Sequence, residues 1–122
     1  MPDIIRTLHV LAVPNVTDTA RYFRDALGFG IEPVVDEGWR FLKRGACRIM
    51  IGECPDALHP SALGDHNYVA YLVVDDVDAL ADEYGASGAR IRAQAADKPW
   101  GMRELLIETP DGHRIMFGQD IS

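Results

Sequence analysis

The sequence predicts an α+β fold in which one strand–helix–strand module occurs twice within a single domain of 122 residues. The first observation is an internal repeat, because the segment LAVPNVTDTARYF beginning at Leu11 matches LVVDDVDALADEY beginning at Leu72. The second is an apolar stripe of helical period, formed in the first copy by Val16, Ala20 and Phe23. A repeat that occurs only twice is typical of paired modules rather than of a solenoid.

The first module is expected over residues 4–54, as a short strand, a helix and further strands. The helix begins after Asn15, whose side chain suits an N-cap, and Gly28 suits its end. The segment VVDEGWRFLKRGACRIMIG then predicts two strands joined by a turn at KRGA. Residues 55–65 are rich in proline and glycine and are expected to link the modules.

The second module is expected over residues 66–120 and repeats this order. Asp76 suits the N-cap of its helix, and Gly85 or Gly88 suits its end. Three strands follow, read from RIRAQAA, RELLIET and HRIMFGQ, and the tight-turn signal PDG at 110–112 joins the last two.

Composition and charge narrow the class of partner. The chain is 48% hydrophobic and 25% charged, as globular domains are, and no apolar run is long enough for a membrane span. The formal net charge of −7 argues against nucleic acid and is compatible with a cationic ligand. Cys47 and Cys54 fit free thiols, and the N-terminus lacks the pattern of a secretory signal, so a cytoplasmic location is expected.

The final strand raises the question of what its second face does. By the period-two rule, Ile115 and Phe117 point to one side, whereas Arg114 and Met116 point to the other. The side of Ile115 and Phe117 is expected to pack under the helices. The opposite face is also apolar, but no helix in the sequence is left to cover it. Such a face is a candidate for a ligand site or a dimer interface.

Four segments carry a resemblance to a known family: NVTDTARYFRDALGFGIE, EGWRFLKRG, YLVVDDVDALADEY and KPWGMRELLIETPDGHRIMF. They resemble the glyoxalase, bleomycin-resistance and extradiol-dioxygenase superfamily, also called vicinal oxygen chelate. The elements LGFG, GW, RG, PWG and PDG are most similar to its bleomycin-resistance branch, and the resemblance covers nearly the whole chain. It implies two βαβββ modules whose strands form a curled mixed sheet around a cavity.

The same resemblance implies where a metal would bind. Metal-using members carry His, Glu or Gln at four strand positions that face the cavity, and the repeat and turn landmarks place these at Leu8, Met50, Val69 and Met116. Thioether and aliphatic groups do not supply the oxygen or nitrogen donors that Mg²⁺, Zn²⁺ or Fe²⁺ need. Neither a metal nor another cofactor is therefore expected.

The histidines are expected to lie outside any metal site. His9 follows Leu8 by one residue and so points to the opposite face of its strand, unless a bulge shifts the register. His59 and His66 are expected in loops, and His113 in a solvated hairpin turn. Three acidic residues near that hairpin are likewise expected to be solvated charges: Glu104, Glu108 and Asp111.

The uncovered face is expected to hold a small organic molecule. Tryptophan stacks on planar or cationic groups, and methionine adapts its shape to a flat guest. Arg48 and Arg114 could pair with an anionic group of that guest, or with Glu53 or Asp120. Ordinary core packing is the alternative for the apolar residues, a loop anchor for Trp100 and dimer packing for Trp39. The residues expected to line the ligand site are Trp39, Phe41, Arg48, Met50, Tyr71, Trp100, Arg114 and Met116.

The sequence therefore predicts a metal-free protein that binds a planar or cationic organic compound. No catalytic residue is predicted, because the chain has neither a phosphate-binding loop nor a nucleophile elbow. Resemblance to the bleomycin-resistance branch implies sequestration of a cationic aromatic glycopeptide by a homodimer with crevices between its subunits. The alternatives are a lyase, isomerase or dioxygenase with a displaced metal site, built for example from Glu53, His59 or His66, and an interaction domain.

Overall fold

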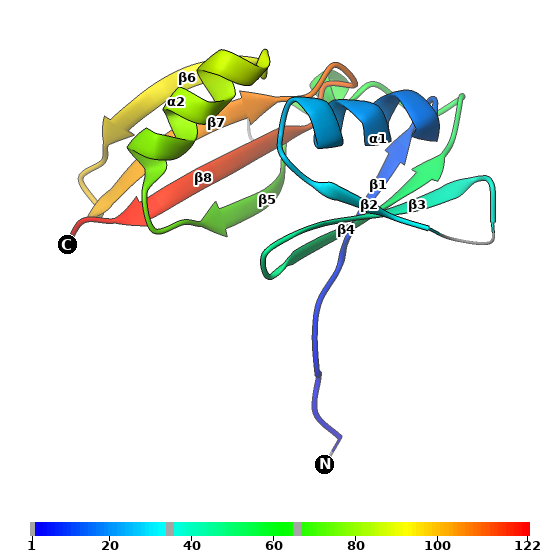
Figure 1. Cartoon of the computed structure of the whole chain (residues 1–122), viewed down its shortest axis with the longest axis horizontal. Coiled ribbons are helices and arrows are strands. Elements are labelled where there is room, and N and C mark those ends of the chain that lie inside the picture. The colour runs from blue at the N-terminus through cyan, green and yellow to red at the C-terminus, as the bar shows by residue number, and fades with distance from the viewer. Residues whose placement is uncertain (1, 34–35, 65–66) are drawn as a thin grey trace.

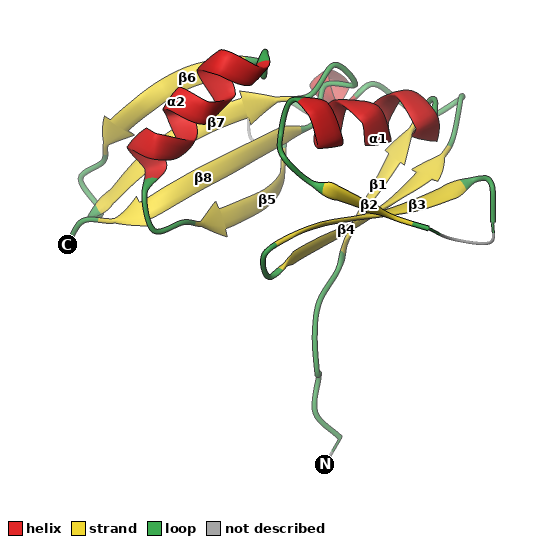
Figure 2. Cartoon of the chain, in the orientation of Figure 1, coloured by secondary structure: helices red, strands yellow, loops and turns green. Residues whose placement is uncertain are grey.

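The computed structural model describes residues 2–33, 36–64 and 67–122, and it contains two sheets that lie side by side (Figure 1). Each sheet carries one long helix, and both helices lie on the same side of the molecule (Figure 2). The first module consists of β1 (His9–Val13), α1 (Val16–Asp25), β2 (Gly30–Glu32), β3 (Trp39–Arg44) and β4 (Cys47–Glu53). After the short 3-10 helix η1 (Pro60–Leu63), the second module consists of β5 (Tyr68–Val73), α2 (Val77–Ser87), β6 (Ile91–Asp97), β7 (Met102–Glu108) and β8 (Arg114–Asp120).

The two sheets have the same topology. Their strand orders are β1-β4-β3-β2 and β5-β8-β7-β6, and in each the first strand pairs in parallel with the last strand of its module. The remaining pairs are antiparallel. This arrangement confirms the expected α+β fold of two βαβββ modules. Hydrogen bonding divides the strands into two four-stranded mixed sheets.

The helices begin and end largely where their capping residues predict. The Asn15 side chain accepts a hydrogen bond from the backbone N–H of Asp18, and the Asp76 side chain accepts one from Ala79. Gly88 ends α2 in the left-handed conformation, with φ of 84°, so Gly85 lies inside the helix. The expected helix stop at Gly28 lies beyond the last helical residue of α1, Asp25.

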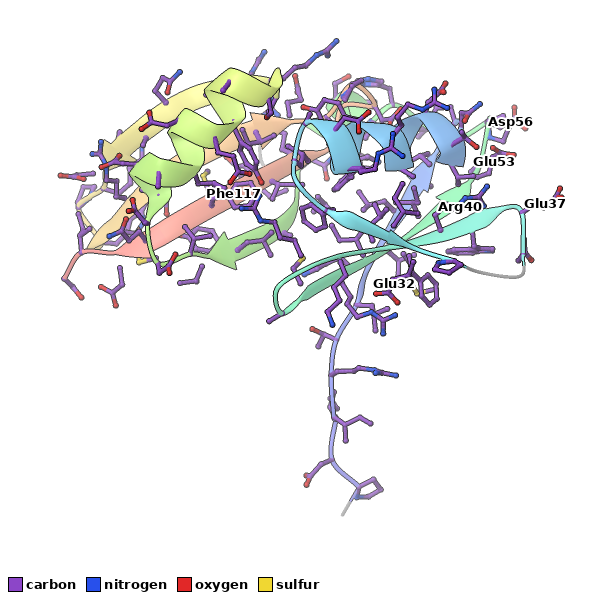
Figure 3. The ribbon with its side chains drawn as sticks, viewed as in Figure 1. Glu32, Glu37, Arg40, Glu53, Asp56 and Phe117 are labelled. Carbon is purple, nitrogen blue, oxygen red and sulfur yellow. The ribbon has the colours of Figure 1, made fainter. Side chains whose placement is uncertain are left out.

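The core fills the space between each helix and its own sheet. Ile115 and Phe117 are buried as expected, and Phe117 lies between β8 and α2 (Figure 3). On β1, Leu11 and Val13 are buried on the same side. The helices therefore cover one face of each sheet, and the opposite face, which we call the open face, carries no helix.

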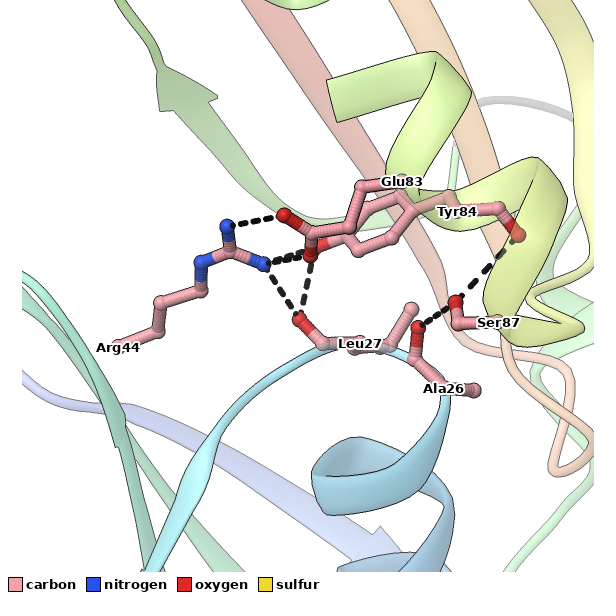
Figure 4. A network of polar contacts seen from close by, with 6 residues as sticks. All are labelled: Ala26, Leu27, Arg44, Glu83, Tyr84 and Ser87. Atoms are coloured by element: carbon pink, nitrogen blue, oxygen red, sulfur yellow. Dashed lines mark hydrogen bonds and ion pairs between the residues drawn. The ribbon is translucent and has the colours of Figure 1, made fainter. Parts of the chain in front are cut away.

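Polar contacts join the two modules at one end of the helices (Figure 4). The Leu27 carbonyl accepts hydrogen bonds from Tyr84 Oη at 3.0 Å and from Arg44 Nη1 at 2.8 Å. Arg44 also pairs with Glu83 at 2.6 Å, and Ser87 Oγ donates to the Ala26 carbonyl. These contacts connect β3 and the end of α1 with α2, and so they fix how the open faces lie relative to one another.

Two details differ from the expectation. His113 is half-buried rather than solvated, because its Nε2 lies 3.1 Å from the Ala12 carbonyl of the other module and donates to it. Val69 lies at a β-bulge between Tyr68 and Ala70 and packs against the core cluster, whereas the period-two rule placed it beside Tyr71 on the open face. The expected loop position of His66 falls outside the described residues.

Candidate functional site

The open face brings the predicted ligand-binding residues together in two groups, one on each sheet. Residues opposite one another in an antiparallel pair share a face, so the register of the strands places each side chain. The first group is Trp39, Phe41, Arg48 and Met50 on β3 and β4. The second is Tyr71, Arg114 and Met116 on β5 and β8, together with Trp100 in the turn before β7.

A repeated pentapeptide sets the layout of both groups. Residues 48–52 read RIMIG and residues 114–118 read RIMFG, and each peptide places arginine, methionine and glycine on the open face. The two glycines provide room for aromatic rings. A Cβ on Gly52 would lie 2.9 Å from Cη2 of Trp39, and a Cβ on Gly118 would overlap the hydroxyl end of Tyr71. This repeat was a signal in the sequence that our prediction did not use.

In the first group, Arg48 lies against an aromatic ring and an acid. Its guanidinium carbon is 5.4 Å from the centre of the Phe41 ring, and its Nη2 is 2.9 Å from Oε2 of Glu32. Glu32 lies on the side of the first sheet away from α1 (Figure 3). The alternative partner, Glu53, instead accepts a hydrogen bond from the first residue of α1, Val16.

The second group surrounds a carboxylate that we expected to be solvated. Glu104 is only 7% exposed, and its Oε2 accepts hydrogen bonds from Tyr71 Oη at 2.7 Å and from Trp100 Nε1 at 2.9 Å. Burial and this hydrogen bond raise the pKa of Tyr71 to about 12, so its hydroxyl remains a donor at neutral pH. The expectation of a solvated charge is therefore wrong for Glu104, which is buried and hydrogen-bonded to two aromatic side chains.

The other two acids near the hairpin also have protein partners. Asp111 accepts a hydrogen bond from Thr19 Oγ1 on α1, and Glu108 Oε1 lies 3.4 Å from Nε of Arg114. Neither acid is simply a solvated charge. Sequence reasoning missed these contacts because each one joins residues that are far apart in the chain or depends on the strand register.

The open face does not offer the donor set of a divalent metal site. In the two parallel pairs, Val10 lies beside Met50 and Tyr71 lies beside Met116. Aliphatic, thioether and protonated phenol groups are poor ligands for Mg²⁺, Zn²⁺ or Fe²⁺. Within residues 2–33, 36–64 and 67–122, no cluster of three or more His, Cys, Asp or Glu side chains is placed to hold a metal ion.

His9 lies on the helix side of its strand, as the sequence predicts. The register of β1 is regular from His9 to Val13, so no bulge turns the imidazole toward Met50. His9 shares its face with Leu11 and Val13 and lines a groove of about 630 Å³ between the modules. This groove runs along the edge of β5 and is bordered by the turn between β3 and β4. His59 lies in the linker as expected, where it caps η1.

The structure is therefore an α+β protein built from two βαβββ modules, and each module has one sheet face that no helix covers. The model of the glyoxalase/bleomycin resistance protein/dioxygenase superfamily matches residues 6–117, and the chain therefore belongs to this superfamily. No curated protein matches the chain. Among the described residues, no helix is both long and apolar enough to cross a membrane.

Solved structures of bleomycin-binding proteins are similar to this chain along almost its whole length. A bleomycin-binding protein complexed with bleomycin shares 25% identity at a TM-score of 0.78, covering 96% of this chain and 99% of its own. A bleomycin resistance determinant encoded on transposon Tn5 shares 25% identity at a TM-score of 0.78, covering 96% and 98%. The bleomycin-binding protein of Streptomyces verticillus shares 22% identity at a TM-score of 0.75, covering 96% and 97%.

Proposed function

We propose that the open face binds a planar, positively charged organic compound and holds it without breaking a bond. The observation that carries this proposal is the exposed aromatic surface around Met50 and Met116. Trp39 is 38% exposed, Tyr71 45% and Trp100 66%, which is unusual for side chains of this size unless they meet a ligand or another protein. The similarity to bleomycin-binding proteins supports the same class of ligand.

The charges of the chain favour a cationic guest. The formal net charge is −7. On the open face, Glu32 and Glu108 pair with arginines, whereas the carboxyl group of Glu104 has only the neutral donors of Tyr71 and Trp100. Flat cations gain both from stacking on indole rings and from the negative potential around such groups. We therefore propose bleomycin itself, or a compound with a similar planar cationic part, as the ligand.

Titration calorimetry with metal-free bleomycin tests this proposal. We expect saturable binding by the wild type and a large loss of affinity in Met116→Lys, because that substitution places a positive charge in the open face. Ala86→Lys is the matched control, since it adds the same charge on the exposed surface of α2 and should bind as the wild type does. Equal affinities of the two variants would place the ligand elsewhere.

Elemental analysis of protein purified without chelators separates binding from metal-dependent catalysis. We expect far less than one equivalent of a transition metal per chain, because none of the four positions predicted from the sequence carries an oxygen or nitrogen donor in its side chain: Leu8, Met50, Val69 and Met116. The strand neighbours of the two methionines, Val10 and Tyr71, do not supply the missing donors. One equivalent of zinc, nickel, manganese or iron that disappears in His9→Ala would instead support an enzyme with a displaced metal site.

We also propose a homodimer that covers part of the open face. Val10 and Val73 are exposed beside the aromatic residues, so the face presents more apolar surface than a lone subunit usually leaves in water. A partner subunit would bury this surface and leave crevices in which a ligand contacts both chains.

A further inference from the structure

The second module differs from the first at the position that faces the repeated glycine. Trp39 stands opposite Gly52 in the first sheet, whereas Glu104 stands opposite Gly118 in the second. The arginine and the methionine of the repeated pentapeptide lie on the same face in both sheets. Their partners on the neighbouring strand also differ, being Lys43 and Phe41 in the first sheet and Glu108 and Leu106 in the second. The second sheet has therefore exchanged an aromatic ring for a carboxylate at the centre of its open face.

This carboxylate is buried without an opposite charge. Among the described residues, no arginine, lysine or histidine forms an ion pair with Glu104, and its two hydrogen bonds come from the neutral groups of Tyr71 and Trp100. A carboxylate removed from water is costly unless its charge is compensated, and two neutral donors compensate it only in part. The fold thus places under the open face a carboxyl group whose hydrogen-bond donors are both neutral.

The arrangement leaves part of the carboxylate available. Both hydrogen bonds end on Oε2, while Oε1 accepts none from the described residues and is not among their fully buried unpaired atoms. Tyr71 and Trp100 meet Glu104 through their polar edges, and both rings remain well exposed. A flat compound resting on either ring would therefore have the negative charge close to its edge.

We propose that Tyr71, Trp100 and Glu104 form a subsite that recognises the positively charged group of the bound compound, with Glu104 as the residue that determines the preference for a cation. The inference rests on the proposed function, which it extends by naming the residue that contacts the positive charge of the bound compound. An N–H donor or a quaternary nitrogen of the guest would lie near Oε1 while its ring stacks on Trp100 or Tyr71. In the described part of the first module, Trp39 stands at the equivalent position, and Glu32 pairs with Arg48.

A matched pair of planar probes tests the subsite. We would measure the affinities of 10-methylacridinium, a permanent cation, and of acridine, its neutral counterpart at pH 8, by titration calorimetry. The wild type is expected to prefer the cation by about tenfold, the scale of one hydrogen bond or contact to a charged group. In Glu104→Gln, which keeps an acceptor for Tyr71 and Trp100, the preference should fall to about twofold or less. The affinity for acridine should stay nearly unchanged.

Glu108→Gln is the matched control for overall charge. Glu108 lies on the same strand and the same face, and it already pairs with Arg114. This variant should keep the wild-type preference for the cation. An equal loss of preference in Glu104→Gln and Glu108→Gln would overturn the subsite, because it would show that the general negative potential of the chain selects the cation.

The salt dependence of the wild type provides a test that needs no variant. Attraction by exposed charges is screened at high ionic strength, whereas contact with a largely buried carboxylate is screened much less. The preference for 10-methylacridinium should therefore persist at ~1 M NaCl, and its disappearance there would overturn the inference even if Glu104→Gln does not fold.

Equal wild-type affinities for the two probes, or no affinity for either, would overturn the subsite. The bleomycin titration decides separately on the proposed function.

Discussion

At the scale of single residues, two aromatic side chains owe their positions to glycines. Trp39 of β3 lies over Gly52, and Tyr71 of β5 lies against Gly118, the equivalent glycine of the second module. A methyl group at either glycine would displace the ring above it, which explains why the pentapeptides RIMIG and RIMFG both end in glycine. Each ring therefore lies close to the sheet backbone, and under our proposal a planar group stacks on it.

Substitution of the two tryptophans should separate binding from stability. Trp100→Ala is expected to weaken ligand binding by about 1–3 kcal/mol, the range for a lost stacking contact. It should cost little stability, because Trp100 is a 66% exposed turn residue. Trp39→Ala should destabilise the fold more, although by less than the roughly 3–5 kcal/mol of a fully buried tryptophan, since its ring covers Gly52. Urea unfolding and ligand titration of both variants measure the two effects.

If Trp100→Ala unfolds the protein but leaves the affinity per folded molecule intact, Trp100 is a structural anchor for Glu104. If neither variant alters binding, the open face is better interpreted as a dimer interface alone.

His113 should make the stability of the protein dependent on pH near neutrality. Burial lowers the pKa of His113 from its ordinary value of 6.5, so the folded state holds the ring neutral. The unfolded chain then binds more protons, and the free energy of unfolding falls as the pH drops through and below 6.5. One such group changes stability by at most about 1.4 kcal/mol per pH unit.

Urea unfolding at several pH values between 7.5 and 5.5 checks this sign, where the range brackets the ordinary histidine value. His113→Gln can still donate to the Ala12 carbonyl but cannot titrate, so its stability should depend less on pH. Ala86→Gln changes an exposed residue of α2 and should keep the wild-type dependence of stability on pH. A free energy of unfolding that depends more steeply on pH in His113→Gln than in the wild type would contradict the assignment of this dependence to His113.

At the scale of elements, the end of α1 and the α2 helix form the junction between the modules. Tyr84 of α2 occupies the place in the repeat that Phe23 occupies in α1, and its additional hydroxyl donates to the Leu27 carbonyl. The ring is fully buried, and burial raises the pKa of Tyr84 to about 12. The hydroxyl is therefore used as a permanent donor across the junction.

Tyr84→Phe should weaken the junction without creating a cavity. Loss of the hydrogen bond is expected to lower the free energy of unfolding by about 1 kcal/mol, because Arg44 still donates to the Leu27 carbonyl. Tyr68→Phe is the control, since that residue is exposed on β5. Urea unfolding measures both variants, and an unchanged stability of Tyr84→Phe would show that Arg44 alone satisfies the carbonyl.

The elements also show how far the sequence predicts this structure. Asn15 and Asp76 located the helix starts because N-caps act locally. The short strand β2 was not delimited in advance, and the 3-10 helix η1 was missed, because neither is long enough to show a period. The bulge at Val69 was missed for a related reason: period-two counting assumes an uninterrupted strand.

The candidate site was predictable in part. The parity of the final strand placed Arg114 and Met116 on the open face, and the strand register bears this out. Glu104 was misjudged because its surroundings depend on β5 and on the turn before β7, which are distant in the sequence or irregular. The four-residue spacing of Trp100 and Glu104 alone did not indicate a hydrogen bond.

At the scale of the whole molecule, two sheets with helices on one side leave an extended apolar face on the other. This geometry underlies both proposals, the ligand site and the homodimer. Because Val10, Tyr71 and Val73 are exposed there, a second subunit would remove much apolar surface from water.

Sedimentation at micromolar concentration tests the dimer. We expect a mass of about twice the 13.5 kDa of one chain. Val73→Lys on the open face should shift the protein toward monomer, whereas Ala86→Lys on α2 should not. A wild type that sediments as a monomer would restrict the ligand site to the open face of a single chain.

Methyl NMR of methionine tests the central claim that the open face is the ligand site. The chain has four methionines, and Met50 and Met116 lie at the centres of the two groups of the open face. Met50→Leu and Met116→Leu assign their methyl resonances. On saturation with metal-free bleomycin, the account predicts that the Met50 and Met116 resonances shift. Saturable binding that leaves both the Met50 and Met116 resonances unmoved would contradict it.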